Sequence, residues 1–251
     1  MDRAFLDTNV LMGELSSDLM LSLAERPYML YQPYWNSHVI HELRKHLPRI
    51  IARTSGAAEM SRTAAERRIK AMCRTFPQAM TRNWHSRLDE AERFVSDPFD
   101  AQILAGAIAS GSDALVTVNL KDFQADDIRE RYGIEVMPTS AFLTELLRED
   151  RTSATKALVA MASRHRNPPR NLRELCEECR RLPELAAFAD SLERSVAERY
   201  EDEVRRMFRP SSSWTQGHDT RGRFTRKPYT DPGDVMPPNG IWGWDGNGPA
   251  I

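Results

Sequence analysis

The sequence predicts an α/β fold in which helices cover both faces of a central parallel sheet. Short apolar segments of strand length alternate with longer segments whose apolar residues recur at helical spacing. One segment, residues 114–118 (ALVTV), is apolar enough to be a strand buried on both faces. A chain of 251 residues can bury a full core, so we expect one domain with an appendage.

The N-terminal part supplies two of the expected strands. Residues 4–6 (AFL) form the first, and residues 28–31 (YMLY), directly after a proline, form the second. Ser37 is expected to cap a helix over residues 38–47, which Pro48 stops or kinks. Two further helices are expected over residues 57–75 and 86–94.

The segment 97–123, DPFDAQILAGAIASGSDALVTVNLKDF, predicts a helix, a turn and a buried strand. Asp97 and Asp100 open the helix, and the SGS sequence before the strand ends it. Three further elements are expected in this part of the chain. They are a helix over residues 126–132 that ends at a glycine, a strand over residues 135–137, and a helix over residues 141–149 that a threonine caps.

Beyond residue 150 the pattern changes. Helical spacing continues over residues 153–164 and 171–209, with no strand, and predicts a C-terminal helical extension over residues 150–210. Residues 211–251 are rich in Gly, Pro, Ser and Trp, a composition typical of a weakly ordered tail.

The composition of the chain says more about its cellular compartment than about its biochemical activity. A net charge of −1 combines with 28% charged residues, so neither an acidic pocket nor a basic surface is excluded. Three cysteines are too few for a disulfide framework, and Cys176 with Cys179 is expected to be a structural pair on a helix. No apolar stretch approaches the roughly 20 residues of a membrane span, and the N-terminus lacks a signal-peptide pattern. We therefore expect a cytoplasmic protein.

Acidic side chains occur where the predicted sheet opens to solvent. Asp7 directly follows the first strand, Asp100 lies in the first turn of its helix, and Asp122 follows the 114–118 strand. Glu42 lies on the helix after the second strand. Sites in open α/β sheets form outside the carboxyl ends of the strands, and converging carboxylates suit a hard cation such as Mg²⁺. Any one of these acids alone is typical of a helix cap, but Asp7 interrupts an apolar strand, where a charge is costly without a partner.

Together these segments resemble a known family. FLDTNVLM, the Glu-bearing helix, DPFDAQILAGAIASGSDALVT and NLKDF resemble, in order and spacing, the motifs of PIN-domain ribonucleases, in particular VapC-type toxins of toxin–antitoxin pairs. The resemblance covers roughly residues 1–147. It implies a three-layer α/β/α domain, Rossmann-like or flavodoxin-like, over residues 1–149. It also implies Mg²⁺- or Mn²⁺-dependent endoribonuclease activity, an antitoxin partner and a homodimer.

The resemblance assigns roles to individual residues. The catalytic and metal-binding acids fall on Asp7, Glu42, Asp100 and Asp122, although Asn119 is the alternative to Asp122 as fourth ligand. The accompanying residues are an extra acid and the polar side chains around the site: Asp97, Thr8, Asn9 and Thr117.

Basic and aromatic residues near Glu42 are candidates to contact RNA. Arg44, Lys45 and Arg49 are expected to hold the phosphate backbone, with a solvated helix face as the alternative. Tyr34, Trp35 and Trp84 are candidates to stack on unpaired bases. Two other functions are left open by the sequence: a housekeeping RNA-processing nuclease, and a non-catalytic module that binds RNA or protein.

Overall fold

A single parallel sheet organises the protein. The computed structural model describes residues 1–55, 58–164 and 171–197. The strands β1 (Arg3–Leu6), β2 (Gln32–Tyr34), β3 (Ala114–Val116) and β4 (Glu135–Met137) pair in parallel in the order β2-β1-β3-β4. The predicted α/β class with a parallel sheet is confirmed. The chain passes from β1 to β2 on one side and then returns to β3 on the other side of β1. The boundary between β1 and β3 is therefore a topological switch point, where ligands bind in such sheets.

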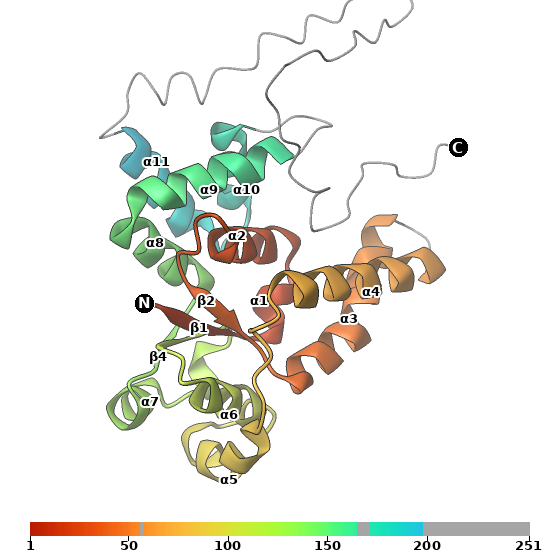
Figure 1. Cartoon of the computed structure of the whole chain (residues 1–251), viewed down its shortest axis with the longest axis vertical. Coiled ribbons are helices and arrows are strands. Elements are labelled where there is room, and N and C mark those ends of the chain that lie inside the picture. The colour runs from red at the N-terminus through yellow and green to blue at the C-terminus, as the bar shows by residue number, and fades with distance from the viewer. Residues whose placement is uncertain (56–57, 165–170, 198–251) are drawn as a thin grey trace, which may run out of the picture.

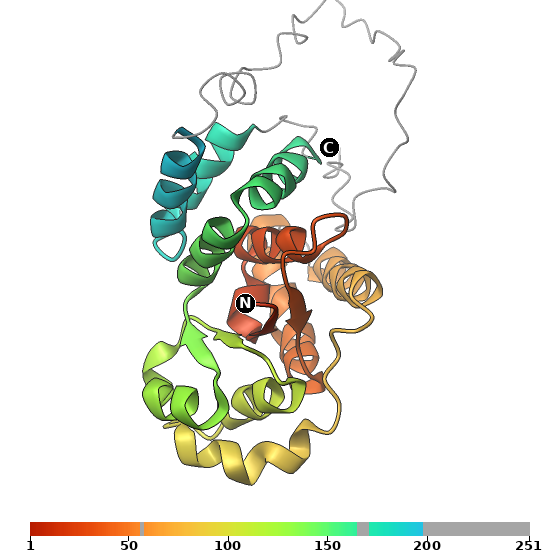
Figure 2. The same cartoon turned by 60° about the vertical axis from the view of Figure 1, so that its left-hand side comes forward.

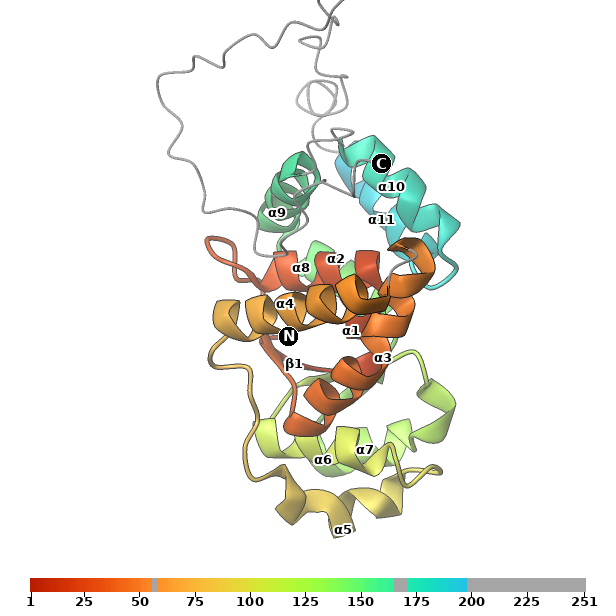
Figure 3. The same cartoon turned by 90° about the vertical axis from the view of Figure 1, so that its right-hand side faces the viewer.

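Helices lie above and below the sheet (Figure 1). In all three views α2 and α8 lie on one side of the strands, and α6 with α7 on the other (Figures 1, 2 and 3). The described helices are α1 (Thr8–Met12), α2 (Glu14–Ala24), α3 (Ser37–Ser55), α4 (Ala58–Thr75), α5 (Leu88–Ala91), α6 (Ala101–Ser110), α7 (Ala125–Tyr132), α8 (Thr139–Glu149), α9 (Arg151–Arg164), α10 (Leu172–Arg181) and α11 (Ala186–Ala197). Three short 3₁₀ turns are η1 (Trp84–Arg87), η2 (Glu92–Phe94) and η3 (Leu120–Asp122).

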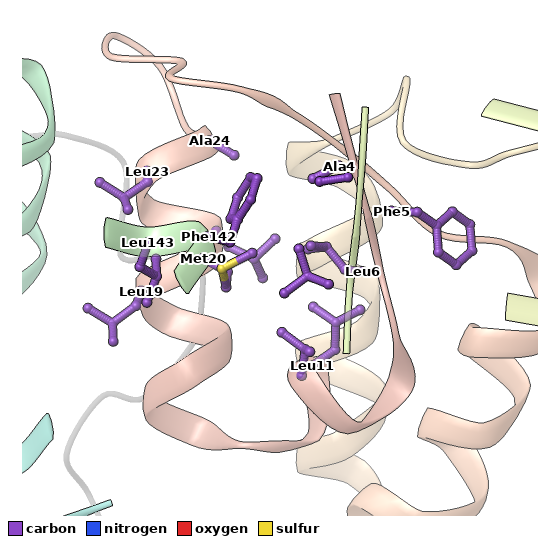
Figure 4. Packing of buried hydrophobic residues seen from close by; sticks show 14 of the residues in the cluster. Ala4, Phe5, Leu6, Leu11, Leu19, Met20, Leu23, Ala24, Phe142 and Leu143 are labelled. Atoms are coloured by element: carbon purple, nitrogen blue, oxygen red, sulfur yellow. The ribbon is translucent and has the colours of Figure 1, made fainter. Parts of the chain in front are cut away.

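Strand β1 contributes to the core on both of its faces, as alternating side chains of a strand must. Leu6 lies on the side of Met20 from α2 and Phe142 from α8, whereas Phe5 points the other way (Figure 4). The Phe5 ring meets α6 at Gly106, where there is no side chain to displace it. Layers on both sides therefore exclude water from the strand.

The second strand was predicted four residues too early. The apolar sequence of residues 28–31 begins in a turn, in which the amides of Tyr28 and Met29 both donate to the carbonyl of Glu25. The strand itself starts at Gln32 and contains Pro33. Proline is tolerated there because β2 lies at the edge of the sheet, where a missing amide donor breaks no ladder.

The helix after β2 also differs from its prediction, at both ends. Pro48 does not stop α3, which continues to Ser55 and packs along α4 (Figure 3). An interior proline costs about 3 kcal/mol, which this packing must offset. The N-terminal cap is Asn36, whose Oδ1 accepts from the Val39 amide at 3.0 Å, while Ser37 Oγ accepts from Trp84 Nε1 at 3.2 Å.

The C-terminal helices pack onto the sheet domain. α9 contacts α2, and α11 contacts α8 (Figure 2). Within residues 171–197, the expected helical segment forms two helices, α10 and α11, and both Cys176 and Cys179 are buried. Its expected continuation over residues 198–209 lies outside the described residues. The expected break at 167–169 and the tail at 211–251 lie outside the described residues. None of the described helices combines the length and apolarity needed to cross a membrane.

Candidate metal and nucleic-acid site

Asp7 lies at the switch point of the sheet. It follows the last residue of β1 and is only 5% exposed. Its Oδ1 accepts from the Thr8 amide at 2.5 Å, and its Oδ2 accepts from Asn9 Nδ2 and Thr117 Oγ1, both at 2.6 Å. Thr117 directly follows β3, so this hydrogen bond joins the carboxyl ends of the two central strands.

Hydrogen bonds stabilise the buried carboxylate of Asp7. Burial raises the pKa of Asp7, and the hydrogen bonds from Thr117, Thr8 and Asn9 act against that rise. Within the described residues, Asp7 belongs to no ion pair, and neither do Asp97, Asp100 and Asp122. These four aspartates therefore carry no paired cation within the described residues.

Asp100 is the second acid at this edge of the sheet. It precedes α6 but does not cap the helix with its side chain, and its Oδ2 accepts from Asn119 Nδ2 at 3.1 Å. Partial burial raises the pKa of Asp100 to about 6, together with the negative charges of Asp7, Asp97 and Asp122. Three acids predicted from the sequence thus lie within electrostatic reach of Asp100.

The loop after β3 contributes in two different ways. Asn119 donates to Asp100 directly, whereas Asp122 acts on it through its charge. The main-chain carbonyl of Asp122 accepts from the Ser96 amide at 2.8 Å, which ties this loop to the segment before α6. Asp97 is exposed, and its Oδ1 accepts from the Phe99 amide at 2.9 Å. Both Asn119 and Asp122 thus lie close to Asp100, and both alternatives for the fourth ligand are kept.

A cavity of about 470 Å³ joins Asp7 and Asp100 to α3, whereas Asp97, Asn119 and Asp122 do not line it. Its wall contains three predicted acids (Asp7, Glu42 and Asp100) and three other predicted site residues (Thr8, Asn9 and Arg49). Among the further lining residues, Arg53 continues the predicted basic series after Arg49, whereas six were not predicted from the sequence: Met12, His38, His46, Ile50, Phe99 and Ile103. Together with Glu42 and Arg49, those on α3 recur three or four positions apart, and this single-face spacing was the signal in the sequence.

Glu42 lines the cavity but is held by side chains of its own helix. Its Oε1 accepts from Lys45 Nζ at 3.3 Å, and its Oε2 lies 3.0 Å from His46 Nε2. Burial raises the pKa of Glu42, but the hydrogen bond and charge of Lys45, with His46 and His38, outweigh burial and leave it below its ordinary value. Glu42 thus differs from Asp7 and Asp100, which form no ion pair in the part of the chain that the structure describes.

The predicted RNA-binding cations are divided between two environments. Arg44 pairs with Glu66 of α4 at 3.1 Å, and Lys45 pairs with Glu42. Neither lines the cavity, whereas Arg49 and the neighbouring Arg53 do. Arg49 and Arg53 therefore border the same cavity as Asp7 and Asp100.

The prediction that Trp35 and Trp84 stack on bases is wrong, because both side chains are buried. Trp35 is completely buried, edge-on to Phe76, and Trp84 is 5% exposed. Neither indole can therefore receive a base. Tyr34 is half-buried in β2.

The donor chemistry suits a hard divalent cation, although the ligand set is incomplete as it stands. In residues 1–55, 58–164 and 171–197, no three His, Cys, Asp or Glu side chains lie close enough together to hold one ion. Asp7 and Asp100 nevertheless present carboxylate oxygens to one cavity, and crowding raises the pKa of Asp100. A divalent cation relieves such repulsion and prefers oxygen ligands. The residues thus fit the ion in kind and charge.

Comparison with protein-family models, with curated proteins and with solved structures finds no match to this chain.

We expect Asp100→Asn to stabilise the metal-free protein above about pH 6. The folded pKa of Asp100, about 6, exceeds its ordinary value of 3.8, so the stabilisation by the protonated acid is complete below about pH 4. It is lost as the pH rises through about 6, whereas asparagine stays neutral. Allowing for solvent screening of a half-buried group, we expect about 1 kcal/mol, or about 2–4 °C in Tm, at pH ~8. Thermal unfolding in EDTA measures this, and parallel Tm–pH curves for both proteins would contradict it.

Proposed function

We propose that this chain is a Mg²⁺- or Mn²⁺-dependent endoribonuclease of PIN type that acts in the cytoplasm. The observation that carries the proposal is the pair Asp7 and Asp100, two carboxylates without ion-pair partners in the described residues, lining one cavity at the switch point. Arg49 and Arg53 line the same cavity and suit a phosphate backbone. The strand order β2-β1-β3-β4 is also that in which flavodoxin-like sheets begin, which supports a three-layer PIN-like domain.

The side chains divide into ligands and residues that orient them. Asp7 and Asp100 would hold the metal, joined by Glu42 and by Asp122 or Asn119. A bound divalent ion supplies Lewis acidity and a water of lowered pKa for attack on a phosphodiester. Asn9 and Thr117 fix the orientation of Asp7 through their hydrogen bonds, and Asn119 does the same for Asp100.

Metal-dependent cleavage is the direct test. The purified protein is expected to cut RNA internally with Mg²⁺ or Mn²⁺ and to lose all cleavage in EDTA, because the two carboxylates need a cation to act on an anionic substrate. Hydrolysis by activated water leaves 5′-phosphate and 3′-hydroxyl ends, which end-labelling of the products identifies. Cleavage that persists in EDTA, or that leaves 2′,3′-cyclic phosphates, contradicts the proposal.

The biological role proposed is that of a toxin neutralised by an antitoxin, and it rests on the resemblance of the motifs. A homodimer is expected on the same ground. Expression of the chain is expected to arrest growth, and co-expression of an antitoxin encoded beside it is expected to relieve the arrest. Normal growth, with accumulation of unprocessed RNA when the gene is deleted, would favour the housekeeping nuclease instead.

A non-catalytic RNA- or protein-binding module is the second candidate. It is favoured by the lack of a three-ligand cluster in the described residues and by Asn119, which presents an amide to Asp100. Titration calorimetry with Mn²⁺ separates the two candidates. Heat of binding that disappears in Asp100→Asn supports the nuclease, and absence of any Mn²⁺ binding by the parent protein supports the module.

A further inference from the structure

One aromatic side chain at the candidate site lies in solvent. Phe99 is 74% exposed, the highest value among the large hydrophobic side chains of the described residues. It directly precedes Asp100 and lines the cavity that contains Asp7. A scattered exposed apolar residue needs no explanation, but a phenyl ring beside a cluster of carboxylates gains nothing from the fold.

The backbone that carries this ring is held in place. The Phe99 amide donates to Asp97 Oδ1 at 2.9 Å, and the Asp100 amide donates to the carbonyl of Asp97 at 2.9 Å. A turn with two hydrogen bonds therefore fixes where the side chain of Phe99 leaves the main chain. In the described part of the chain, its ring stacks on no other aromatic ring.

Three other exposed apolar side chains belong to the segments that carry site residues. Ile50 of α3 lines the cavity, while Val118 and Leu120 flank Asn119 in the loop after β3. With Phe99, these make four of the seven exposed large hydrophobic residues in the described chain. Two of these four, Phe99 and Ile50, line the cavity itself, and the other two lie in the loop that carries Asn119.

The chemistry of the cavity selects the occupant. It contains carboxylates, an exposed ring, and the guanidinium-bearing residues Arg49 and Arg53. A nucleic-acid strand matches the arginines and the ring, because its phosphates suit the arginines and its bases have flat faces that stack on aromatic rings. The carboxylates suit the same strand once they hold the proposed divalent cation. In a duplex those faces are already covered by the neighbouring base pairs, so only an unpaired base can stack on Phe99.

We propose that Phe99 is the platform on which an unpaired base stacks, next to the phosphodiester that reacts at Asp7 and Asp100. Phe99 is then a residue that selects single-stranded substrate. This inference rests on the proposed action on RNA, but stacking itself requires no cleavage and is measured separately.

The test is oligonucleotide binding in the Asp100→Asn background, which blocks cleavage and removes one negative charge. Fluorescence anisotropy with a short, labelled, unstructured oligouridine gives the affinity of the Phe99 protein and of Phe99→Ala, Phe99→Leu and Phe99→Tyr. Loss of one stacked base is expected to weaken binding about tenfold or more in Phe99→Ala and Phe99→Leu, whereas Phe99→Tyr keeps the affinity. Met29→Ala is the matched control, because Met29 is 46% exposed but precedes β2, at the opposite edge of the sheet.

The outcomes separate stacking from its alternatives. The inference is overturned if Phe99→Ala binds oligouridine as tightly as the protein with Phe99 intact. It is also overturned if the protein with Phe99 intact does not bind oligouridine. An unimpaired Phe99→Leu overturns stacking and indicates a general apolar contact, as for a protein partner. In the active protein, Phe99→Ala is expected to raise KM more than it lowers kcat. If binding depends on Phe99 but the protein with Asp100 intact cleaves no RNA, only the nuclease proposal is contradicted. If that protein cleaves RNA and Phe99→Ala leaves its KM unchanged, only stacking is contradicted.

Discussion

Asp7→Asn and Asp100→Asn are each expected to lower metal-dependent RNA cleavage by about 100-fold or more. Asparagine keeps the size of the side chain and one oxygen, but removes the negative charge that a divalent cation requires. Loss of a single charged or hydrogen-bonding group at such a site costs about 10²–10³ in rate. The two acids line one cavity and Asp7 acts electrostatically on Asp100, so neither is expected to replace the other.

The two substitutions differ in their risk to the fold. Asp7 accepts three hydrogen bonds, and the new amide of Asp7→Asn would face the donor Nδ2 of Asn9. Asp100 accepts a side-chain bond only from Asn119, so Asp100→Asn is the safer variant. Glu130→Gln is the matched control, because it removes a charge from an exposed position of α7. Circular dichroism and Tm establish folding, and undiminished cleavage by both folded Asp variants rules this site out.

Site residues that lie next to a strand end could be predicted from the sequence, whereas those far from a strand end could not. Asp7 could be placed because it directly follows β1, and Thr117 because it directly follows β3. Asp100 precedes α6, which runs back toward the start of β3 and so begins at the same edge. Adjacency along the chain fixes the position of such residues once the sheet is known to be parallel.

The contacts of Glu42 could not be predicted in this way. They depend on the rotation of α3 about its axis, which places Lys45 and His46 beside the carboxylate at helical spacing. The sequence shows that these residues share a face, but only tertiary packing decides that this face borders the cavity. Phe99 escaped prediction for a similar reason, because a phenylalanine before a helix is more often part of the core.

The same limit explains the errors in the fold. β3 was found because its three residues are completely buried between layers and therefore apolar throughout. β2 was misplaced because Gln32 and Pro33 have little strand propensity, and only pairing along the β1 edge makes them a strand. Local pattern identified the central strand, whereas the edge strand depends on its neighbour.

Gly106→Ala is expected to destabilise the protein by about 2–3 kcal/mol, although alanine is the better helix former by about 1 kcal/mol. A Cβ on Gly106 would lie 2.3 Å from Phe5 Cζ and 2.8 Å from Asn36 Nδ2. Phe5 and Asn36 are both fully buried, so neither can turn into solvent. The Asn36 amide also donates to the carbonyl of Gln102 in α6, at 2.8 Å, so a shift of Asn36 strains the first turn of the helix that follows Asp100. We therefore expect a fall in Tm of about 4–12 °C and weaker cleavage.

A double-mutant cycle with Phe5→Leu identifies the cause. If the clash with the ring dominates, the smaller leucine makes room, and Gly106→Ala costs less in the Phe5→Leu background than in the parent. Gly133→Ala is the control, because a Cβ there meets nothing within 4 Å and only its φ of +70° is strained, at about 1 kcal/mol. Denaturant unfolding gives the four free energies of the cycle. Equal costs of Gly106→Ala in both backgrounds would show that β1 and α6 are not held together by this close approach, and that another contact fixes Asp100 beside Asp7.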